Sequence, residues 1–161
     1  NIYHRSKESA FAETGMTRVF EWWNKLDYDK YFLLSACHPF LTIETIDEFY
    51  KNIIKNDRKG LFGVVKRKNY FWDSNKNMIT KWTEGQTGFN TKYVDETYEA
   101  AHCLYSGYLK DIGKNIQLGD FSKNEVNLYV IEDEFQTLDI DYPWQFDLYD
   151  KFIKYNLTNK K

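Results

Sequence analysis

Two aspartates near the end of the chain, Asp139 and Asp141, have a spacing that could hold a divalent cation. They end a segment, residues 135–140, that we expect to be a strand, and in an extended strand side chains two residues apart point to the same face. Two carboxylates on one face supply the oxygen ligands that Mg²⁺ prefers. Pro143 fits the first turn of a following helix, for which Asp141 could be the N-cap. The structural alternative is therefore one capping aspartate and one solvated aspartate.

A second loop has a similar setting. Residues 30–35 are a short apolar run, as expected for a strand buried on both faces, and residues 35–41 follow as a loop. The two prolines of the chain, Pro39 and Pro143, thus both come just after an expected strand and near the start of a helix. In open α/β sheets, ligands bind beyond the carboxyl ends of strands. We therefore expect residues 35–41 and 138–146 to face a ligand.

Alternating helices and strands would position these loops. Helical spacing of apolar residues predicts helices over residues 16–26, 43–54 and 146–153, with a short one near 108–113. Apolar runs predict strands over residues 30–35, 61–65, 100–105, 127–131 and 135–140. A polar turn at residues 73–77 between aromatic segments predicts a small hairpin that leaves the sheet. The expected fold class is α/β, with three layers, a mostly parallel sheet and helices on both faces.

The composition is that of one folded domain. A chain of 161 residues with 42% hydrophobic and 19% aromatic content can build a single core. Its net charge of −2 argues against nucleic acid or an anionic membrane as the main partner. No apolar run approaches the roughly 18 residues of a membrane span, and no signal peptide is evident, so we expect a cytoplasmic protein. Cys37 and Cys103 lack disulfide-framework or zinc-finger spacing and are expected to be reduced thiols.

Two motifs carry a resemblance to a known family. They are LSACHPFL at residues 34–41 and LDIDYPWQF at residues 138–146. Both resemble the cytidylyltransferases that make CMP-activated acidic sugars, of which acylneuraminate cytidylyltransferase is the nearest. The resemblance implies that Asp139 and Asp141 hold Mg²⁺ between the CTP phosphates and the sugar acid, with Asp141 the first choice as direct ligand. It also implies that the anomeric hydroxyl of N-acetylneuraminate, or of a related nonulosonic acid, attacks CTP and releases pyrophosphate.

The same resemblance suggests further contacts. The candidates for substrate binding are Ser35, His38, Thr91, Lys92 and His102, and those for nucleotide binding are Arg5 and Ser6. Lys92 would supply the cation that meets the sugar carboxylate. For His102, which falls in an expected strand, a hydrogen-bonded core histidine is the alternative.

The chain departs from the family at its start. The family begins with a strand, a triphosphate-binding loop rich in Gly, Ser, Arg and Lys, and a helix, whereas the eight glycines here are scattered. We therefore expect one domain, residues 1–161, that lacks its N-terminal strand-loop-helix segment. The alternatives are a non-catalytic α/β module, a subunit completed by another chain, or a transferase for 3-deoxy-octulosonate. Trp72 and Trp82 on the expected hairpin would suit a dimer surface, so a homodimer is expected.

Overall fold

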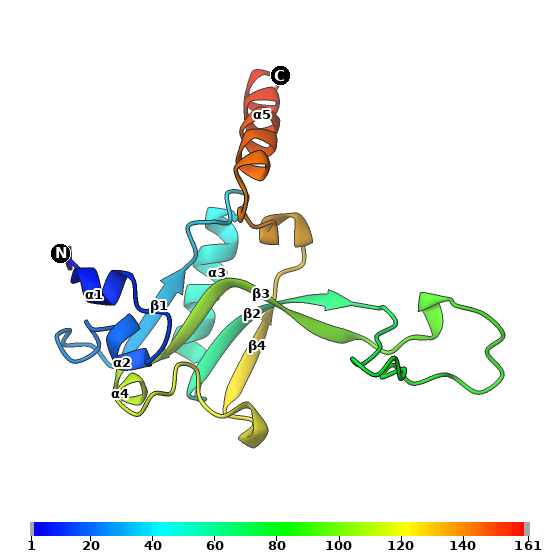
Figure 1. Ribbon diagram of the computed structural model, residues 1–161, viewed down its shortest axis with the longest axis horizontal. Coiled ribbons are helices and arrows are strands. Elements are labelled where there is room, and N and C mark those ends of the chain that lie inside the picture. Colours follow the sequence, from blue (N-terminus) through cyan, green and yellow to red (C-terminus); the bar gives the residue numbers. More distant parts are fainter. Residues whose placement is uncertain (1, 160–161) are drawn as a thin grey trace.

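A four-stranded sheet forms the centre of the computed structural model, which describes residues 2–159 and the side chains of residues 2–156 (Figure 1). The strand order is β1-β3-β2-β4, and the strands are β1 (Lys30–Leu34), β2 (Gly60–Arg67), β3 (Thr97–Tyr108) and β4 (Val126–Val130). β3 pairs antiparallel with both β1 and β2, and β4 pairs parallel with β2. Three strands thus share one direction, as expected, and the sheet is mixed because the long β3 runs against them.

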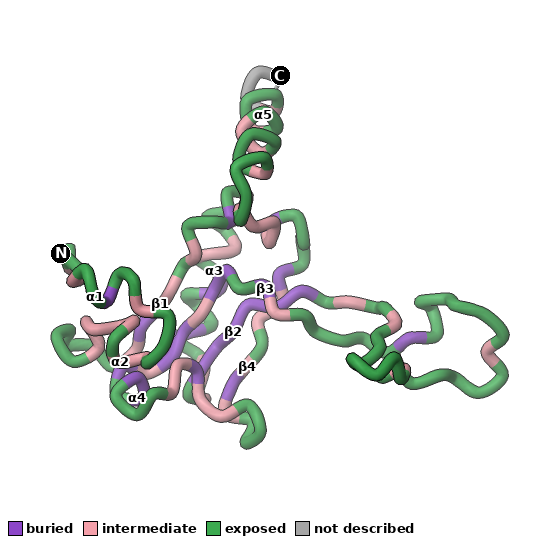
Figure 2. Tube along the Cα trace, in the orientation of Figure 1, coloured by how far each residue is buried: buried purple, intermediate pink, exposed green. Residues whose placement is uncertain are grey.

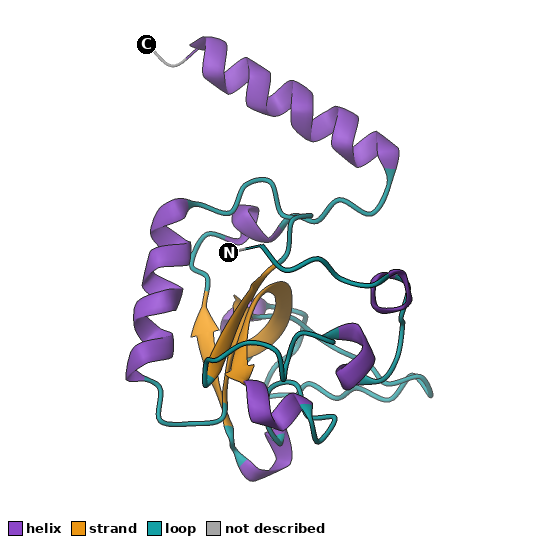
Figure 3. Cartoon of the chain, turned by 90° about the vertical axis from the view of Figure 1, so that its left-hand side faces the viewer, coloured by secondary structure: helices purple, strands orange, loops and turns teal. Residues whose placement is uncertain are grey.

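Helices cover both faces of this sheet, which gives the expected three layers (Figure 3). α3 (Ile43–Lys55) begins after Thr42, whose hydroxyl accepts a hydrogen bond from the Thr45 backbone N–H, and it buries Phe49 and Ile53 on one face. The opposite face is covered by α2 (Met16–Val19), α4 (Leu109–Ile112) and the tryptophans after α2. The helix expected over residues 16–26 is therefore shorter than its apolar pattern suggested. A further short helix, α1 (Lys7–Ala10), precedes it.

β3 is irregular where it passes the middle of β2. Phe62 pairs with Tyr105 but Val64 pairs with Ala100, so residues 101–104 of β3 stand opposite Gly63 alone. His102 in this bulge has a φ of 54°, in the left-handed region that favours glycine. Bulges of this kind bend a strand and redirect its side chains. The side chain of His102 is consequently exposed instead of lying in the core.

Residues 68–96 form an arm between β2 and β3 that extends away from the sheet (Figure 1). It contains the expected hairpin, with an isolated bridge between Trp72 and Met78. The Asp73 carboxylate closes the turn by accepting hydrogen bonds from the backbone N–H groups of residues 75 and 77. The 3₁₀ helix η1 (Thr91–Tyr93) lies on the return path. Most of the arm is exposed (Figure 2).

The expected strand over residues 135–140 is wrong. The 3₁₀ helix η3 (Glu134–Thr137) and an irregular stretch occupy this segment, followed by α5 (Pro143–Asn159), which extends away from the sheet (Figures 1 and 3). Local hydrogen bonds explain the difference: the Asp133 carboxylate accepts from the Phe135 N–H, and the Thr137 hydroxyl donates to the Glu134 carbonyl. None of the helices in residues 2–159 combines the length and apolarity that crossing a membrane requires.

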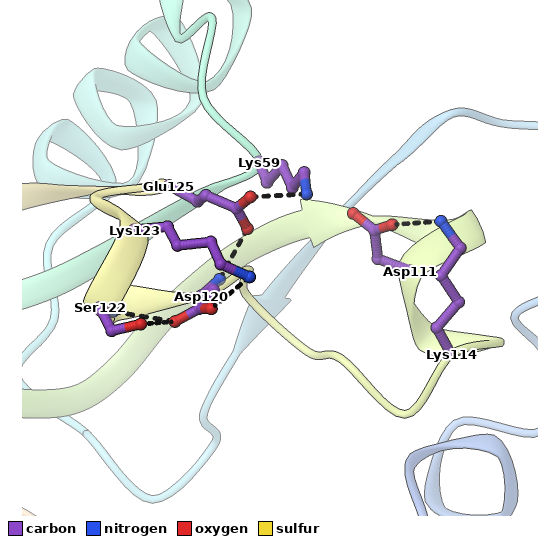
Figure 4. A network of polar contacts seen from close by, with 7 residues as sticks. All are labelled: Lys59, Asp111, Lys114, Asp120, Ser122, Lys123 and Glu125. Carbon is purple, nitrogen blue, oxygen red and sulfur yellow. Dashed lines mark hydrogen bonds and ion pairs between the residues drawn. The ribbon is translucent and has the colours of Figure 1, made fainter.

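A network of ion pairs fixes the end of the sheet where β2 and β4 begin (Figure 4). Lys59 Nζ lies 2.7 Å from a Glu125 carboxylate oxygen, and its hydrogen bond lowers the pKa of Glu125. The Asp120 carboxylate caps η2 (Phe121–Lys123) by accepting hydrogen bonds from Ser122, which with Lys123 lower the pKa of Asp120 to about 2. These contacts tie the two parallel strands together at the end opposite the cleft described next.

Candidate active site

A cleft of about 660 Å³ lies at the carboxyl ends of β1, β2 and β4, the place where open α/β sheets bind ligands. β2 and the bulged part of β3 form one side. The loop after β1 and the segment between β4 and α5 form the other. The polar side chains at its surface include His38, Arg67, Glu99, His102, Glu134 and Asp139.

Direct hydrogen bonds join the two loops that were expected to face a ligand. The Ile140 N–H donates to the Cys37 carbonyl at 3.0 Å. The Gln136 side-chain oxygen accepts from both the backbone N–H and the hydroxyl of Thr42, at 3.1 and 3.2 Å. Because Gln136 is buried and Thr42 is the N-cap of α3, this contact anchors the loop after β1 to η3. The two loops therefore form one continuous wall of the cleft.

His38 is buried in this wall, with 6% of its surface exposed. Its Nδ1 atom has no hydrogen-bond partner in the described part of the chain and lies 3.9 Å from Asp139 Oδ1. The Asp139 side chain is 41% exposed, borders the cleft, and accepts a hydrogen bond from the next backbone N–H at 2.8 Å. A buried polar atom without a partner costs about 1–3 kcal/mol. The wall thus contains an unmet polar contact directly beside the cleft.

Asp141 has a different position from Asp139. It is exposed and does not border the cleft. The expectation that both carboxylates share the face of a strand fails because the segment is not extended in a sheet. The side-chain oxygen of Gln145 accepts hydrogen bonds from the N–H groups of Asp141 and Tyr142, the two residues before α5, at 2.7 and 2.8 Å. The structure therefore brings one aspartate of the pair to the cleft.

Arg67 and its two partners were missed from the sequence. Arg67 Nε donates to Glu99 on β3 at 2.6 Å, and its Nη1 pairs with Glu134 on η3. These contacts bridge the two sides of the cleft. Arg67 comes two residues after the apolar run of β2, at the carboxyl end of the strand, and that position was the available signal. Its partners are distant in sequence, which hid the cluster.

Of the remaining candidates for substrate binding, one borders the cleft and the others do not. His102 borders it, with Nδ1 3.3 Å from the Tyr105 hydroxyl. Ser35 follows β1 without bordering it, and its hydroxyl accepts from the Cys37 N–H. Thr91 and Lys92 are exposed on η1 in the arm, outside the cleft lining.

Arg5 and Ser6 lie in the N-terminal segment and are already engaged there. Arg5 donates to the carbonyls of Ser9 and Val19. Ser6 donates its N–H and hydroxyl to Glu21, and these hydrogen bonds lower the pKa of Glu21. Neither Arg5 nor Ser6 borders the cleft.

This mixed sheet with helices on both faces is the nucleotide-diphospho-sugar transferase-like fold. No protein-family model and no curated protein matches the sequence. Among solved structures, a CMP:2-keto-3-deoxy-manno-octonic acid synthetase complexed with CTP matches with a TM-score of 0.62 and 8% identity, covering 91% of this chain and 70% of that chain. The 4-diphosphocytidyl-2C-methyl-D-erythritol synthase of Anaerococcus prevotii DSM 20548 matches with a TM-score of 0.60 and 16% identity, covering 89% and 68%. Similarity at these identities establishes the shared fold.

Proposed function

We propose that this protein is a nucleotidyltransferase that transfers CMP from CTP to an acidic sugar, N-acetylneuraminate or a related nonulosonic acid, and releases pyrophosphate. The observation that carries this proposal is the cleft at the strand carboxyl ends, bordered by Asp139 of the D-x-D motif. Two synthetases with cytidine in their names share the fold, and one of them is complexed with CTP. That neighbour also acts on a sugar acid by name, which supports an acidic acceptor here.

The residues present fit a divalent cation, expected to be Mg²⁺. Asp139 offers a partly exposed carboxylate at the cleft, and carboxylate oxygen is a ligand that Mg²⁺ prefers. Residues 2–159 contain no group of three or more His, Cys, Asp or Glu side chains that could hold a metal, so the protein would give one or two ligands. Mg²⁺ commonly takes the rest from water and substrate phosphates. When bound, it would neutralise charge developing on the phosphates.

The side chains of the cleft would hold the acceptor. Arg67 is the one non-histidine cation of the lining, and a guanidinium pairs with a carboxylate through two parallel hydrogen bonds. The aromatic rings of Phe135 and Tyr149 border the same cleft and would exclude water. Positioning the anomeric hydroxyl against the α-phosphate removes much of the entropic cost of attack. Lys92 stays a prediction as a second cation for the carboxylate.

We further propose that the expected N-terminal strand-loop-helix segment pairs with β1. In the described chain β1 pairs only with β3, which leaves the other edge of an apolar strand free. A groove of about 390 Å³ runs beside this strand and is bordered by Tyr31, Phe32 and Leu33. Natural proteins rarely leave an apolar edge strand uncovered, and an added strand would satisfy its backbone groups. Such a segment would also bring the triphosphate-binding loop that the scattered glycines do not provide.

A cytoplasmic homodimer remains part of the proposal. The arm exposes Trp72 and Trp82, whose rings pack around Phe89, and exposed aromatic clusters are typical of protein interfaces. The competing function is a non-catalytic α/β module or a partner-completed subunit, favoured by the lack of a glycine-rich loop. The second alternative is a cytidylyltransferase of the same kind whose acceptor is 3-deoxy-octulosonate.

A substrate panel tests the proposal. The full-length protein is incubated with CTP, Mg²⁺ and N-acetylneuraminate, other nonulosonic acids or 3-deoxy-octulosonate, and released pyrophosphate is measured. Asp139→Asn should nearly abolish turnover. Asp141→Asn should do so only if Asp141, which lies outside the cleft lining, also reaches the cation, and Asp147→Asn on α5 should leave turnover unchanged. Normal turnover in both variants would remove the metal role, and no pyrophosphate with any sugar acid would favour the non-catalytic module.

A further inference from the structure

His102 has a backbone conformation that few side chains adopt, and it has it within a strand. Its φ is 54°, in the left-handed region. In the described chain three other non-glycine residues have a positive φ, Lys76, Asn115 and Asn124, and all three lie in turns or bends. Strained residues of this kind cluster at functional sites, where the surrounding contacts keep them in place. The His102 side chain is exposed and borders the cleft, so a functional reason for the strain is to be sought there.

Two aromatic neighbours hold the imidazole ring of His102. Its Nδ1 atom lies 3.3 Å from the hydroxyl of Tyr105, three residues further along β3. Phe62 on β2 packs against both rings, with its centroid 5.9 Å from that of His102 and 5.2 Å from that of Tyr105. Tyr105 is outside the cleft lining, so the Nδ1 edge of the imidazole is turned from the cleft. The opposite edge carries Nε2, which has no hydrogen-bond partner in the described chain.

The hydrogen bond with Tyr105 decides which ring nitrogen of His102 carries the proton. Burial raises the pKa of Tyr105 to about 12, so its hydroxyl keeps its hydrogen near neutral pH. That hydroxyl has no other partner in the described chain, and it therefore donates to Nδ1 when the imidazole is neutral. The proton of the neutral ring then lies on Nε2. In a protonated imidazole both nitrogens carry hydrogen, and Nε2 is again a donor.

We propose that Tyr105 is a positioning residue that holds His102 with its Nε2–H toward the cleft, where this group donates a hydrogen bond to an oxygen atom of the acidic sugar. The inference rests on the proposed function for the identity of the ligand. Ionised carboxylates of the cleft can only accept hydrogen bonds, and Arg67 is already engaged by Glu99 and Glu134. His102 thus offers an uncommitted donor, which suits a ligand that is rich in oxygen atoms.

Nitrogen-15 NMR of the imidazole side chains in the full chain tests the positioning role without ligand or turnover. At pH 8 the His102 signal, identified because His102→Gly removes it, should show the proton on Nε2. Tyr105→Phe keeps the aromatic ring but removes the hydroxyl, so part of the signal should move to the form with the proton on Nδ1. Tyr129→Phe is the matched control, because the Tyr129 hydroxyl bonds to Glu48 away from the cleft, and it should leave the His102 signal unchanged. A proton on Nδ1 in the wild-type protein, or an unchanged signal in Tyr105→Phe, would overturn the proposal.

Steady-state transfer from CTP to N-acetylneuraminate tests the contact with the sugar. His102→Gly removes the side chain at a backbone conformation that glycine adopts freely, so the fold should be retained. Its KM for the sugar acid should rise about 3- to 10-fold, as for the loss of one neutral hydrogen bond, while kcat should change by less than about 2-fold. His102→Gln, whose amide N–H can take the place of Nε2–H, should recover part of this loss. Tyr105→Phe should raise KM by no more than His102→Gly does. An unchanged KM in His102→Gly would overturn the contact with the sugar.

The inference and the proposed function can fail separately. Addition of N-acetylneuraminate and Mg²⁺ to the labelled protein should shift the Nε2 signal of His102 even where no transfer follows, and a signal that does not move would overturn the contact. If transfer fails while the signal moves, only the proposed function is lost. If transfer occurs while the signal and the KM of His102→Gly stay unchanged, only the role of His102 and Tyr105 is lost.

Discussion

Gln136 holds the wall of the cleft together, and replacing it by leucine should loosen both loops at once. Its side-chain oxygen is buried and accepts two hydrogen bonds from Thr42, at 3.1 and 3.2 Å. Gln136→Leu keeps the volume of the side chain but leaves the Thr42 N–H without a partner. Thr42 is exposed, so water replaces part of the lost hydrogen bond, and we expect the free energy of unfolding to fall by about 1 kcal/mol, the usual net value of a hydrogen bond. For a domain of this size the melting temperature would then fall by about 2–4 °C.

Urea unfolding followed by tryptophan fluorescence measures this change, with an unchanged m-value as the sign that only stability is altered. Gln117→Leu is the matched control, because the Gln117 side chain makes no hydrogen bond with the described part of the chain, and its effect should stay within about 0.5 kcal/mol. Equal destabilisation by the two substitutions would show that the amide of Gln136 contributes nothing beyond its packing. The inference that it joins the two loops would then be wrong.

Two further predictions concern residues next to the cleft. Cys37 is exposed, whereas Cys103 is fully buried and burial raises its pKa to about 11. Mass spectrometry should therefore find one alkylated thiol in the native protein and two after unfolding. Two alkylated thiols in the native protein would contradict the buried position of Cys103. His102→Gly should leave the free energy of unfolding within about 0.5 kcal/mol of wild type, because relief of a left-handed backbone offsets the entropy of glycine, whereas His102→Val should cost at least about 1 kcal/mol.

Local patterns predicted the elements whose hydrogen bonds and packing are local. The N-cap Thr42 and the apolar stripe after it predicted both ends of α3 closely, and the polar turn at residues 73–77 predicted the hairpin. The place of β3 between β1 and β2 could not be read from the sequence, because it depends on pairing between segments far apart in the chain. The same limit hid the bulge at residues 101–104.

Asp139 borders the cleft, although the strand that was predicted to carry it is absent. The sequence favoured a strand over residues 135–140, but hydrogen bonds of the Asp133 and Thr137 side chains stabilise a 3₁₀ helix over residues 134–137. Asp139 still reaches the cleft because Ile140 is bonded to the loop after β1. Asp141 does not, since Gln145 binds its backbone N–H and turns the chain into α5. Two aspartates that looked equivalent in sequence thus have different surroundings.

The charge of the cleft gives a last prediction about how an acidic ligand binds. Four carboxylates border it, from Glu99, Asp133, Glu134 and Asp139, against the single guanidinium of Arg67. Two like charges about 5 Å apart repel by about 3 kcal/mol at the effective dielectric of a protein surface. A sugar acid alone should therefore bind weakly, and a divalent cation should strengthen its binding. Salt screens the repulsion, so without the cation its affinity should rise with ionic strength.

Isothermal titration of N-acetylneuraminate with and without Mg²⁺, at low and high salt, measures both effects. Glu134→Gln removes one repelling charge and frees part of Arg67 for the ligand, so it should raise the affinity for the acid. Glu44→Gln, on the exposed first turn of α3, is the control and should not. If the affinity for N-acetylneuraminate fell with salt and did not change with the cation, the acid would bind to a positively charged surface. The cleft would then not be where the sugar acid binds, since its carboxylates outnumber its one guanidinium.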